Sequence, residues 1–158
     1  MTKKESSKVD KSQDLVNYRD LILATLDYYL ENKIMEIKTS DFDSALHFQS
    51  LKTQTIDHFE NGRLTKLKQW FRDLSEMQIE TRDLKFNTYL RNKTGLDIDI
   101  FQDYFERINK VIECGKITTD NQFYDVRKMV DYLCQTDPVD QRQIEILNKL
   151  LIDYEQKK

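Results

Sequence analysis

The amino-acid sequence predicts an all-α fold, an irregular bundle of six or seven helices. Glycine supplies only 3 of the 158 residues and proline 1, and a fold built from strands needs many more turns than these residues can form. Apolar residues recur at spacings of three and four, which is the spacing of one helical face. With 8 phenylalanines and 8 tyrosines, the chain is also too rich in aromatic residues to be disordered.

Two helices are expected in residues 116–155, where the signals for helix ends are clearest. Residues 118–122 read Thr-Thr-Asp-Asn-Gln, which is typical of a capping box at a helix start. Asp137 is the expected N-cap of the second helix, with Pro138 at its first position. The apolar face of the first helix would consist of Phe123, Val126, Val130 and Leu133, and that of the second of Ile144, Leu147, Leu151 and Tyr154.

The earlier part of the chain is divided by several helix stops. We expect a first helix over residues 14–32 and a second that begins at Ser40 or Asp41 and ends at Asn61-Gly62. A third helix is expected over residues 63–80, and after a break at 81–83 a fourth that ends at Lys93-Thr94-Gly95. The fifth is expected to begin at about Asp99 and to end at Cys114-Gly115. Residues 33–38 would form a short extended link. The predicted organisation is a disordered charged tail at 1–13, a helical bundle at 14–115 and a C-terminal helical pair at 116–158, packed on the bundle as one domain.

Compartment is predicted from the absence of targeting signals. The first residues are charged and lack the apolar core of a signal peptide, and no run approaches the roughly 18 apolar residues of a membrane span. A cytoplasmic protein is therefore expected. Cys114 and Cys134 are expected to be reduced and largely buried thiols, since a disulfide is uncommon in that compartment.

Charge is arranged in blocks along the chain. Residues 61–93 hold 8 basic and 4 acidic side chains, a net of +4, between acidic flanks. The basic side chains Lys66, Lys68, Arg72 and Arg82 are a candidate surface for an anion or a nucleic acid. The other interpretation is a helix face that meets water or docks on its acidic neighbours, and the overall net charge of −3 favours it.

The sequence shows no pattern that predicts a cofactor, a metal site or catalysis. His47 and His58 are 11 residues apart, so on one helix they would lie about 16 Å apart at 1.5 Å per residue, too far to share a metal ion. Asp43 and His47 are one turn apart, which favours a surface hydrogen bond over a ligand pair. The two cysteines form no CxxC pair and no glycine-rich phosphate loop is present, although a Cys–His nucleophile pair brought together by the fold stays open.

The C-terminal segment resembles the N-terminal helical pair of HigA-type antitoxins. The resemblance is carried by Ile117-Thr118-Thr119-Asp120-Asn121-Gln122-Phe123, Val130-Asp131-Tyr132-Leu133, Pro138, Glu145-Ile146-Leu147, Leu150-Leu151-Ile152 and Asp153-Tyr154-Glu155. It covers about a quarter of the chain. The helix-turn-helix domain that follows in that family has no counterpart after Lys158, so the resemblance implies partner or self association and no DNA reading.

The function predicted from the sequence is that of a small non-catalytic interaction or regulatory protein, for which a homodimer is one form of association. The contacting side would consist of Leu147, Leu150, Leu151 and Tyr154, unless these residues face the protein's own core. A nucleic-acid-associated accessory protein that uses residues 61–93 is the alternative. An enzymatic or ligand-binding bundle with a polar pocket near His47 and His58 is the third hypothesis.

Overall fold

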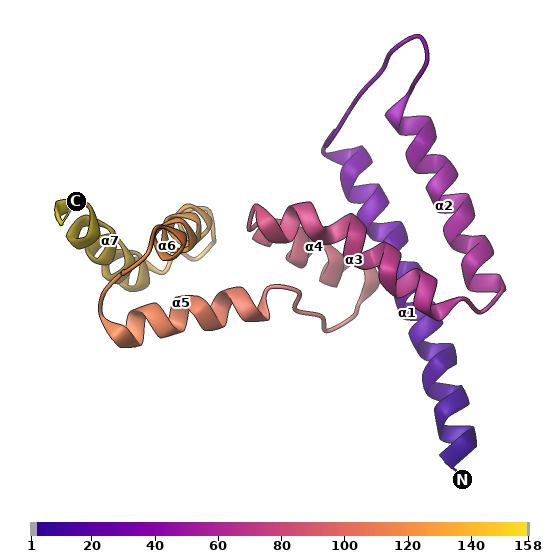
Figure 1. The fold of residues 1–158 in the computed structure, drawn as a ribbon, viewed down its shortest axis with the longest axis horizontal. Helices are drawn as coiled ribbons and strands as arrows, with labels where there is room; N and C mark the ends of the chain where they lie inside the picture. The colour runs from indigo at the N-terminus through magenta and orange to yellow at the C-terminus, as the bar shows by residue number, and fades with distance from the viewer. Residues whose placement is uncertain (1–2, 158) are drawn as a thin grey trace. The chain divides into compact units, whose positions relative to one another are not determined.

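The computed structural model describes the backbone of residues 3–157 and the side chains of residues 10–157. This part of the chain is all-α, as predicted, and its seven helices are drawn in Figure 1. They are α1 (Lys3–Glu31), α2 (Ser44–Glu60), α3 (Leu64–Glu80), α4 (Leu84–Thr94), α5 (Gln102–Cys114), α6 (Asp120–Leu133) and α7 (Gln141–Gln156). An isolated bridge between Lys38 and Asp43 is the one β-type pairing that the described residues make.

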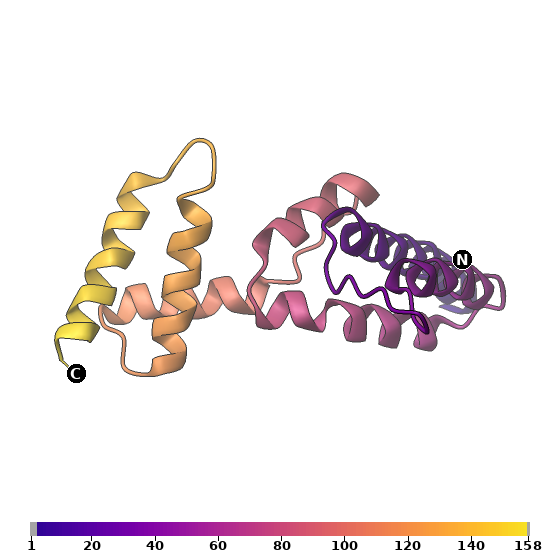
Figure 2. The same cartoon turned by 90° about the horizontal axis from the view of Figure 1, so that it is seen from above.

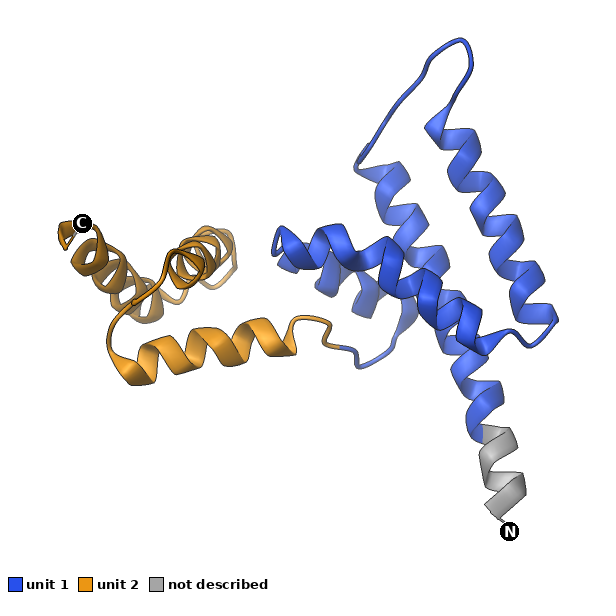
Figure 3. Cartoon of the chain, in the orientation of Figure 1, with its two compact units in different colours: residues 1–98 blue, residues 99–158 orange. Residues whose placement is uncertain are grey.

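The helices divide into two compact units, residues 1–98 and 99–158, coloured separately in Figure 3. Unit 1 holds α1 to α4, and unit 2 holds α5 to α7. The sequence placed the boundary at residue 115 and expected one domain. The structure places the boundary earlier because α5 packs on α6 and belongs with the C-terminal pair.

Helix α1 is the centre of unit 1 and packs against α2, α3 and α4 (Figures 1 and 2). Residues 21–29 explain this position, because their buried side chains cover more than half of the circumference of the helix, which is wider than the apolar stripe of a surface helix. The helix begins at Lys3 rather than after a tail that ends at residue 13. No glycine or proline interrupts residues 3–31, so the helix can extend that far; residues 1 and 2 lie outside the described part.

Unit 2 is held together by one apolar stripe on each helix and by a buried carboxylate. The stripe on α5 is formed by Tyr104, Ile108 and Val111, at the spacing of one helical face. Arg107 of α5 donates from Nε to Oδ2 of Asp125 on α6 at 3.0 Å, and the Asp125 side chain is only 5% exposed. The Tyr104 hydroxyl donates to the backbone carbonyl of the same aspartate at 2.5 Å. The polar contacts between α5 and α6 therefore converge on Asp125.

Several helix ends lie where the sequence predicted them. The hydroxyl of Thr119 accepts from the backbone N–H of Gln122 at 3.2 Å, while the Gln122 side chain accepts from the N–H of Thr118 at 2.8 Å. Gly95 and Gly115 end α4 and α5 with φ angles of 71° and 77°, a left-handed conformation that glycine adopts at little cost. These signals are local, which is why the sequence alone reveals them.

The predicted start of α7 is wrong by three residues. The helix begins at Gln141, and its N-cap is Asp140, whose carboxylate accepts from the backbone N–H of Gln143 at 3.2 Å. Asp140 and Gln143 stand at the spacing of a capping box. The carboxylate of Asp140 therefore caps the helix, three residues after the expected cap at Asp137. Pro138 therefore lies in the loop before the helix.

The predicted start of α2 is wrong in the same direction. Ser40 and Asp41 lie in the preceding loop, and Asp43 is the N-cap, with its carboxylate accepting from the backbone N–H of Ala45 at 2.9 Å. The hydroxyl of Thr39 accepts from the N–H of Phe42 at 3.0 Å. Because this turn includes Phe42, the helix begins only after it, at Ser44.

Replacing Arg107 with leucine should destabilise unit 2 by about 1–2 kcal/mol. A hydrogen bond to a charged group contributes about 1.5–3 kcal/mol, and the half-exposed arginine, with 49% of its side chain accessible, is partly screened by water. Hydrogen exchange measured by mass spectrometry should show faster opening of α5 and α6, by about 5- to 30-fold. Lys110→Leu, an exposed cation on the same helix, is the matched control, and an equal effect of the two substitutions would contradict the role of Asp125.

Unit 1 should lose stability at alkaline pH through its buried tyrosines. Burial first, and then the hydrogen bond from the Tyr28 hydroxyl to Asp83 at 2.6 Å, raise the pKa of Tyr28, and burial with the nearby Glu31 raises the pKa of Tyr89 to about 12. The unfolded chain releases these protons near pH 10, so this stability is present below pH 10 and is lost as the pH rises toward 12. Urea unfolding at pH 9 and 11 should show a smaller loss for Tyr28→Phe than for the parent, and equal losses would contradict the role of Tyr28.

Candidate functional site

The loop between α1 and α2, residues 32–43, has a defined conformation. The backbone N–H of Ile37 donates to the hydroxyl of Ser44 at 2.9 Å, and the N–H of Ser44 donates to the carbonyl of Ile37 at 2.8 Å. The prediction of an extended link holds only for its second part, since the chain first turns through residues 32–35. Lys33 and Met35 have φ angles of 53° and 54°, a left-handed conformation that costs a non-glycine residue about 1–3 kcal/mol.

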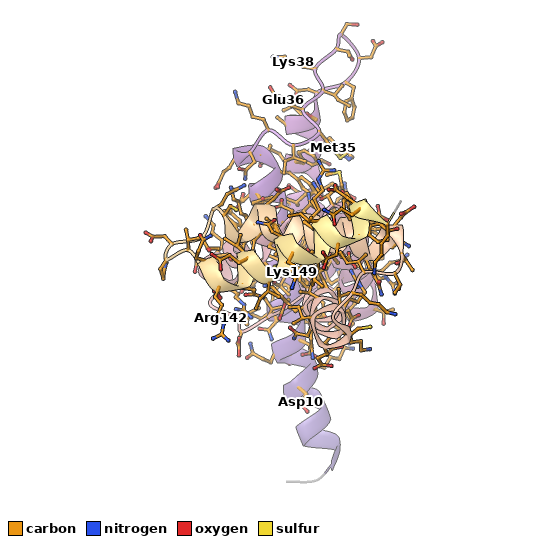
Figure 4. The ribbon with its side chains drawn as sticks, turned by 90° about the vertical axis from the view of Figure 1, so that its left-hand side faces the viewer. Asp10, Met35, Glu36, Lys38, Arg142 and Lys149 are labelled. Carbon is orange, nitrogen blue, oxygen red and sulfur yellow. The ribbon has the colours of Figure 1, made fainter. Side chains whose placement is uncertain are left out.

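Large apolar side chains on this loop and at the start of α2 are exposed to solvent. Met35 is 60% exposed, Ile37 48%, Phe42 43% and Leu46 69%. Figure 4 labels Met35 together with Glu36 and Lys38, all three on the loop that follows α1. Scattered exposed apolar residues are ordinary, and Leu46 projects from the side of α2 opposite Ser44 and Phe48. Met35, Ile37 and Phe42 gather on the loop, which is the kind of patch that marks an interaction surface.

The loop forms one wall of an apolar groove of about 360 Å³. We call it the unit 1 groove, and its lining residues come from α1, the loop, α2 and α3: Tyr29, Met35, Ile37, Phe42, Ser44, His47, Phe48, Leu51, Asp73, Leu74 and Met77. Most of these side chains are apolar or aromatic, which is typical of a binding site. The two methionines are flexible and polarisable, so they adapt to different apolar surfaces.

The buried lining of the groove is fixed by Tyr29 and Phe48. Their rings stack with centroids 5.6 Å apart and an interplanar angle of 13°. The Tyr29 hydroxyl donates to Oε1 of buried Gln78 at 2.7 Å and to the backbone carbonyl of Leu74. Burial raises the pKa of Tyr29, which keeps this hydroxyl protonated as a donor. The groove therefore has a rigid base beneath its more exposed walls.

A second hollow of about 250 Å³ adjoins the loop. It shares Tyr29, Ile37, Ser44 and Phe48 with the unit 1 groove, and its other lining residues include Lys33, Glu36 and Lys38. Ile37, which bonds to Ser44, therefore lines both an apolar hollow and one with charged lining residues.

The walls of the unit 1 groove carry two titratable side chains. His47 lies beside the rings of Phe42 and Phe48, with centroids 5.6 and 6.0 Å away. Asp73 of α3 is exposed, and its carboxylate has neither a hydrogen bond nor an ion pair with any side chain that the structure describes. An apolar groove with one free carboxylate at its edge is suited to binding an apolar surface that carries a cation.

The four basic residues predicted as an anion surface do not form one patch. Lys68 and Arg72 are exposed on one side of α3, while Lys66 lies more than 100° away around the helix axis. Arg82 lies beyond the end of α3 at Glu80, which is itself about 21 Å along the helix axis from Lys66 at 1.5 Å per residue, and its side chain donates to the carbonyl of Glu80. Of the four, Lys66 alone lines the open hollow of about 670 Å³ at the start of α3, together with Lys11, His58, Gly62, Arg63, Leu64, Thr65 and Gln69.

The predicted contact face of α7 is largely turned into unit 2. Leu147 and Leu150 are buried and Leu151 is half-buried. The Tyr154 hydroxyl donates to Asp120 of α6 at 2.5 Å. The helical spacing of these residues marks the core of the unit, which is the second of the two interpretations that the sequence left open.

The two histidines belong to unit 1 and the two cysteines to unit 2. Both histidines lie on α2, and His58 packs edge-on against Trp70 at 4.8 Å with Arg63 Nη1 3.0 Å from its Nδ1; burial and then Arg63 lower its pKa. Cys114 and Cys134 are free and exposed, so the prediction of buried thiols is wrong. Each lies at a helix end, beyond the buried stripe of its helix.

No group of three or more His, Cys, Asp or Glu side chains among the residues described is arranged to hold a metal ion. None of the described helices combines the length and the apolar character needed to cross a bilayer. Comparisons of the chain with models of protein families, with curated proteins and with solved structures found no match. The resemblance to HigA-type antitoxins therefore stays a prediction.

Both thiols should react with a thiol reagent in the folded protein. Because Cys114 and Cys134 are exposed, Ellman's reagent should modify both without denaturant, at rates within about tenfold of those in urea. Cys114→Ser and Cys134→Ser should each remove one of the two reactive groups. A thiol that reacts only after unfolding would show that its side chain is covered.

Proposed function

We propose that the chain is a non-catalytic interaction protein that binds an apolar segment of another protein in the unit 1 groove. The observation that carries the proposal is the gathering of exposed Met35, Ile37 and Phe42 along a hollow with an aromatic base. Association of a second copy of the chain, and a cytoplasmic location, remain predictions from the sequence.

A protein segment fits this surface better than a small molecule does. A small ligand would fill the hollow without covering the exposed parts of Met35, Ile37 and Phe42, which are 60%, 48% and 43% exposed. A helix laid across the groove would cover the hollow and these three side chains together, as in other helix-in-groove complexes. Burying one large apolar side chain contributes about 1.5–3 kcal/mol, so three of them supply a substantial part of the affinity of a typical interface.

The polar groups of the groove also support binding rather than catalysis. The Ser44 hydroxyl accepts the backbone N–H of Ile37, so it contributes to the structure of the loop. His47 lies against aromatic rings, and Asp73 stands on the opposite helix. Ser44 therefore fixes the loop, while His47 and Asp73 form the edges of the groove for a bound segment.

Peptides selected from a phage-displayed random library should bind the full chain and require the groove. A peptide of about 15 residues, or four helical turns, selected on the parent protein should bind it in a fluorescence-anisotropy titration. Met35→Glu and Phe42→Glu should each weaken that binding by about tenfold or more, because each places a charge against apolar peptide surface.

Ile56→Glu is the matched control, since Ile56 is an exposed apolar residue of α2 that does not line the groove. It should leave the peptide affinity within about twofold. Equal losses for all three substitutions, or a selected peptide that ignores both groove substitutions, would contradict the proposal. Sizing with light scattering on the same proteins shows whether a second copy occupies the groove, which Met35→Glu would then disrupt.

A further inference from the structure

We infer that the segment bound in the unit 1 groove is a basic amphipathic helix whose lysines or arginines face an acidic row on α3. The acidic row consists of Asp73, Glu76 and Glu80. This inference rests on the proposed function and names the chemistry of the partner.

The acidic row follows one face of α3 and reaches the groove at Asp73. The three residues stand at i, i+3 and i+7, so their side chains project from one side of the helix, with axial separations from Asp73 of about 4.5 and 10.5 Å at 1.5 Å per residue. Asp73 lines the unit 1 groove together with its neighbours Leu74 and Met77. The row therefore forms a charged edge beside an apolar surface.

The three carboxylates are exposed, and no side chain that the structure describes neutralises them. Among the side chains that the structure describes, none lies within ion-pair distance of Asp73, Glu76 or Glu80. Arg72 is one turn before Glu76 without pairing with it, and Arg82 donates to the backbone carbonyl of Glu80 instead of to its carboxylate. The row is thus available to a cation from outside.

The placement of the row on α3 is unfavourable for the helix itself. Acidic residues are favourable near a helix N-terminus and basic residues near a C-terminus because of the helix dipole. In α3 the arrangement is reversed, with Lys66 and Lys68 in the first half, Glu76 and Glu80 in the second, and neither an acidic first turn nor a basic last turn. This charge pattern costs stability and has no ion-pair partner among the described side chains, so it is suited to a basic partner.

A helix fits this edge better than an extended strand does. Strand addition needs free backbone donors and acceptors, but at the loop the N–H and carbonyl of Ile37 already bond to Ser44, and the N–H of Thr39 bonds to the carbonyl of Phe42. A partner must therefore be recognised through side chains. A bound helix presents its side chains at i, i+3 and i+7, the spacing of the acidic row on α3. An anionic membrane or a nucleic acid would be repelled by the acidic edge.

Two designed helical peptides with the same leucine face test the inference, one flanked by lysines and the other by glutamates. The lysine peptide should bind the full chain about tenfold or more tightly than the glutamate peptide at low salt, with a difference that shrinks as salt screens the exposed charges. The variant Asp73→Asn, Glu76→Gln, Glu80→Gln should lose this preference. Its thermal midpoint should equal or exceed that of the parent, because the unfavourable dipole interaction is removed.

The charge-matched control is Asp103→Asn, Glu106→Gln, Glu113→Gln, which removes three exposed carboxylates from α5 in unit 2. It should keep the preference for the lysine peptide. If both peptides bind equally and Met35→Glu abolishes the binding of both, the inference of a basic partner is overturned. The proposal that the groove is a binding site then still holds. Binding of neither peptide together with failure of the library selection would overturn the proposed function.

Two further outcomes overturn the inference as well. Lysine-peptide binding that Met35→Glu does not weaken would show attraction to the charged edge without use of the groove. Stronger retention on vesicles that contain phosphatidylserine than on the lysine peptide would identify a lipid surface instead.

Discussion

The rest of unit 1 depends on the burial of residues 21–29 in α1. A helix whose buried side chains cover more than half of its circumference needs several neighbours, and α2, α3 and α4 supply them. Tyr29 lies at the end of this stretch and joins the core to the groove, since its ring stacks on Phe48 while its hydroxyl bonds to Gln78. The base of the groove is therefore an extension of the core, which makes it rigid.

The helical fold could be read from the sequence because its signals are local. A cap at Thr119 or a stop at Gly115 involves residues a few positions apart, and a stripe such as Leu67 and Phe71 repeats within one helix. Where two local signals compete, the sequence alone does not rank them: Asp137-Pro138 and Asp140 both indicate a start for α7, and the structure uses Asp140. The division into units depends on packing between helices, so the assignment of α5 to unit 2 could not be predicted in this way.

The groove was missed for the same physical reason. Helical spacing shows that Leu147 and Leu150 lie on one face, but it does not say whether that face meets a partner or the helix beside it, and here α6 is part of its surroundings. The exposed side chains that matter belong to a loop, where no periodicity applies. One signal was present, namely Met35 and Ile37 between two helices in a stretch that is too short to be a helix of its own. Apolar residues in such a link deserve the same scrutiny as a helical stripe.

The bonded loop between α1 and α2 has a consequence for the thermodynamics of association. Ser44 holds Ile37 by two hydrogen bonds, and the strained backbone at Lys33 and Met35 is set when the chain folds. The entropy of ordering this surface is thus lost during folding, and a preorganised site does not lose it again on binding. The ordering cost of a complex falls on the incoming segment, so its affinity should follow the helix propensity of that segment in free solution.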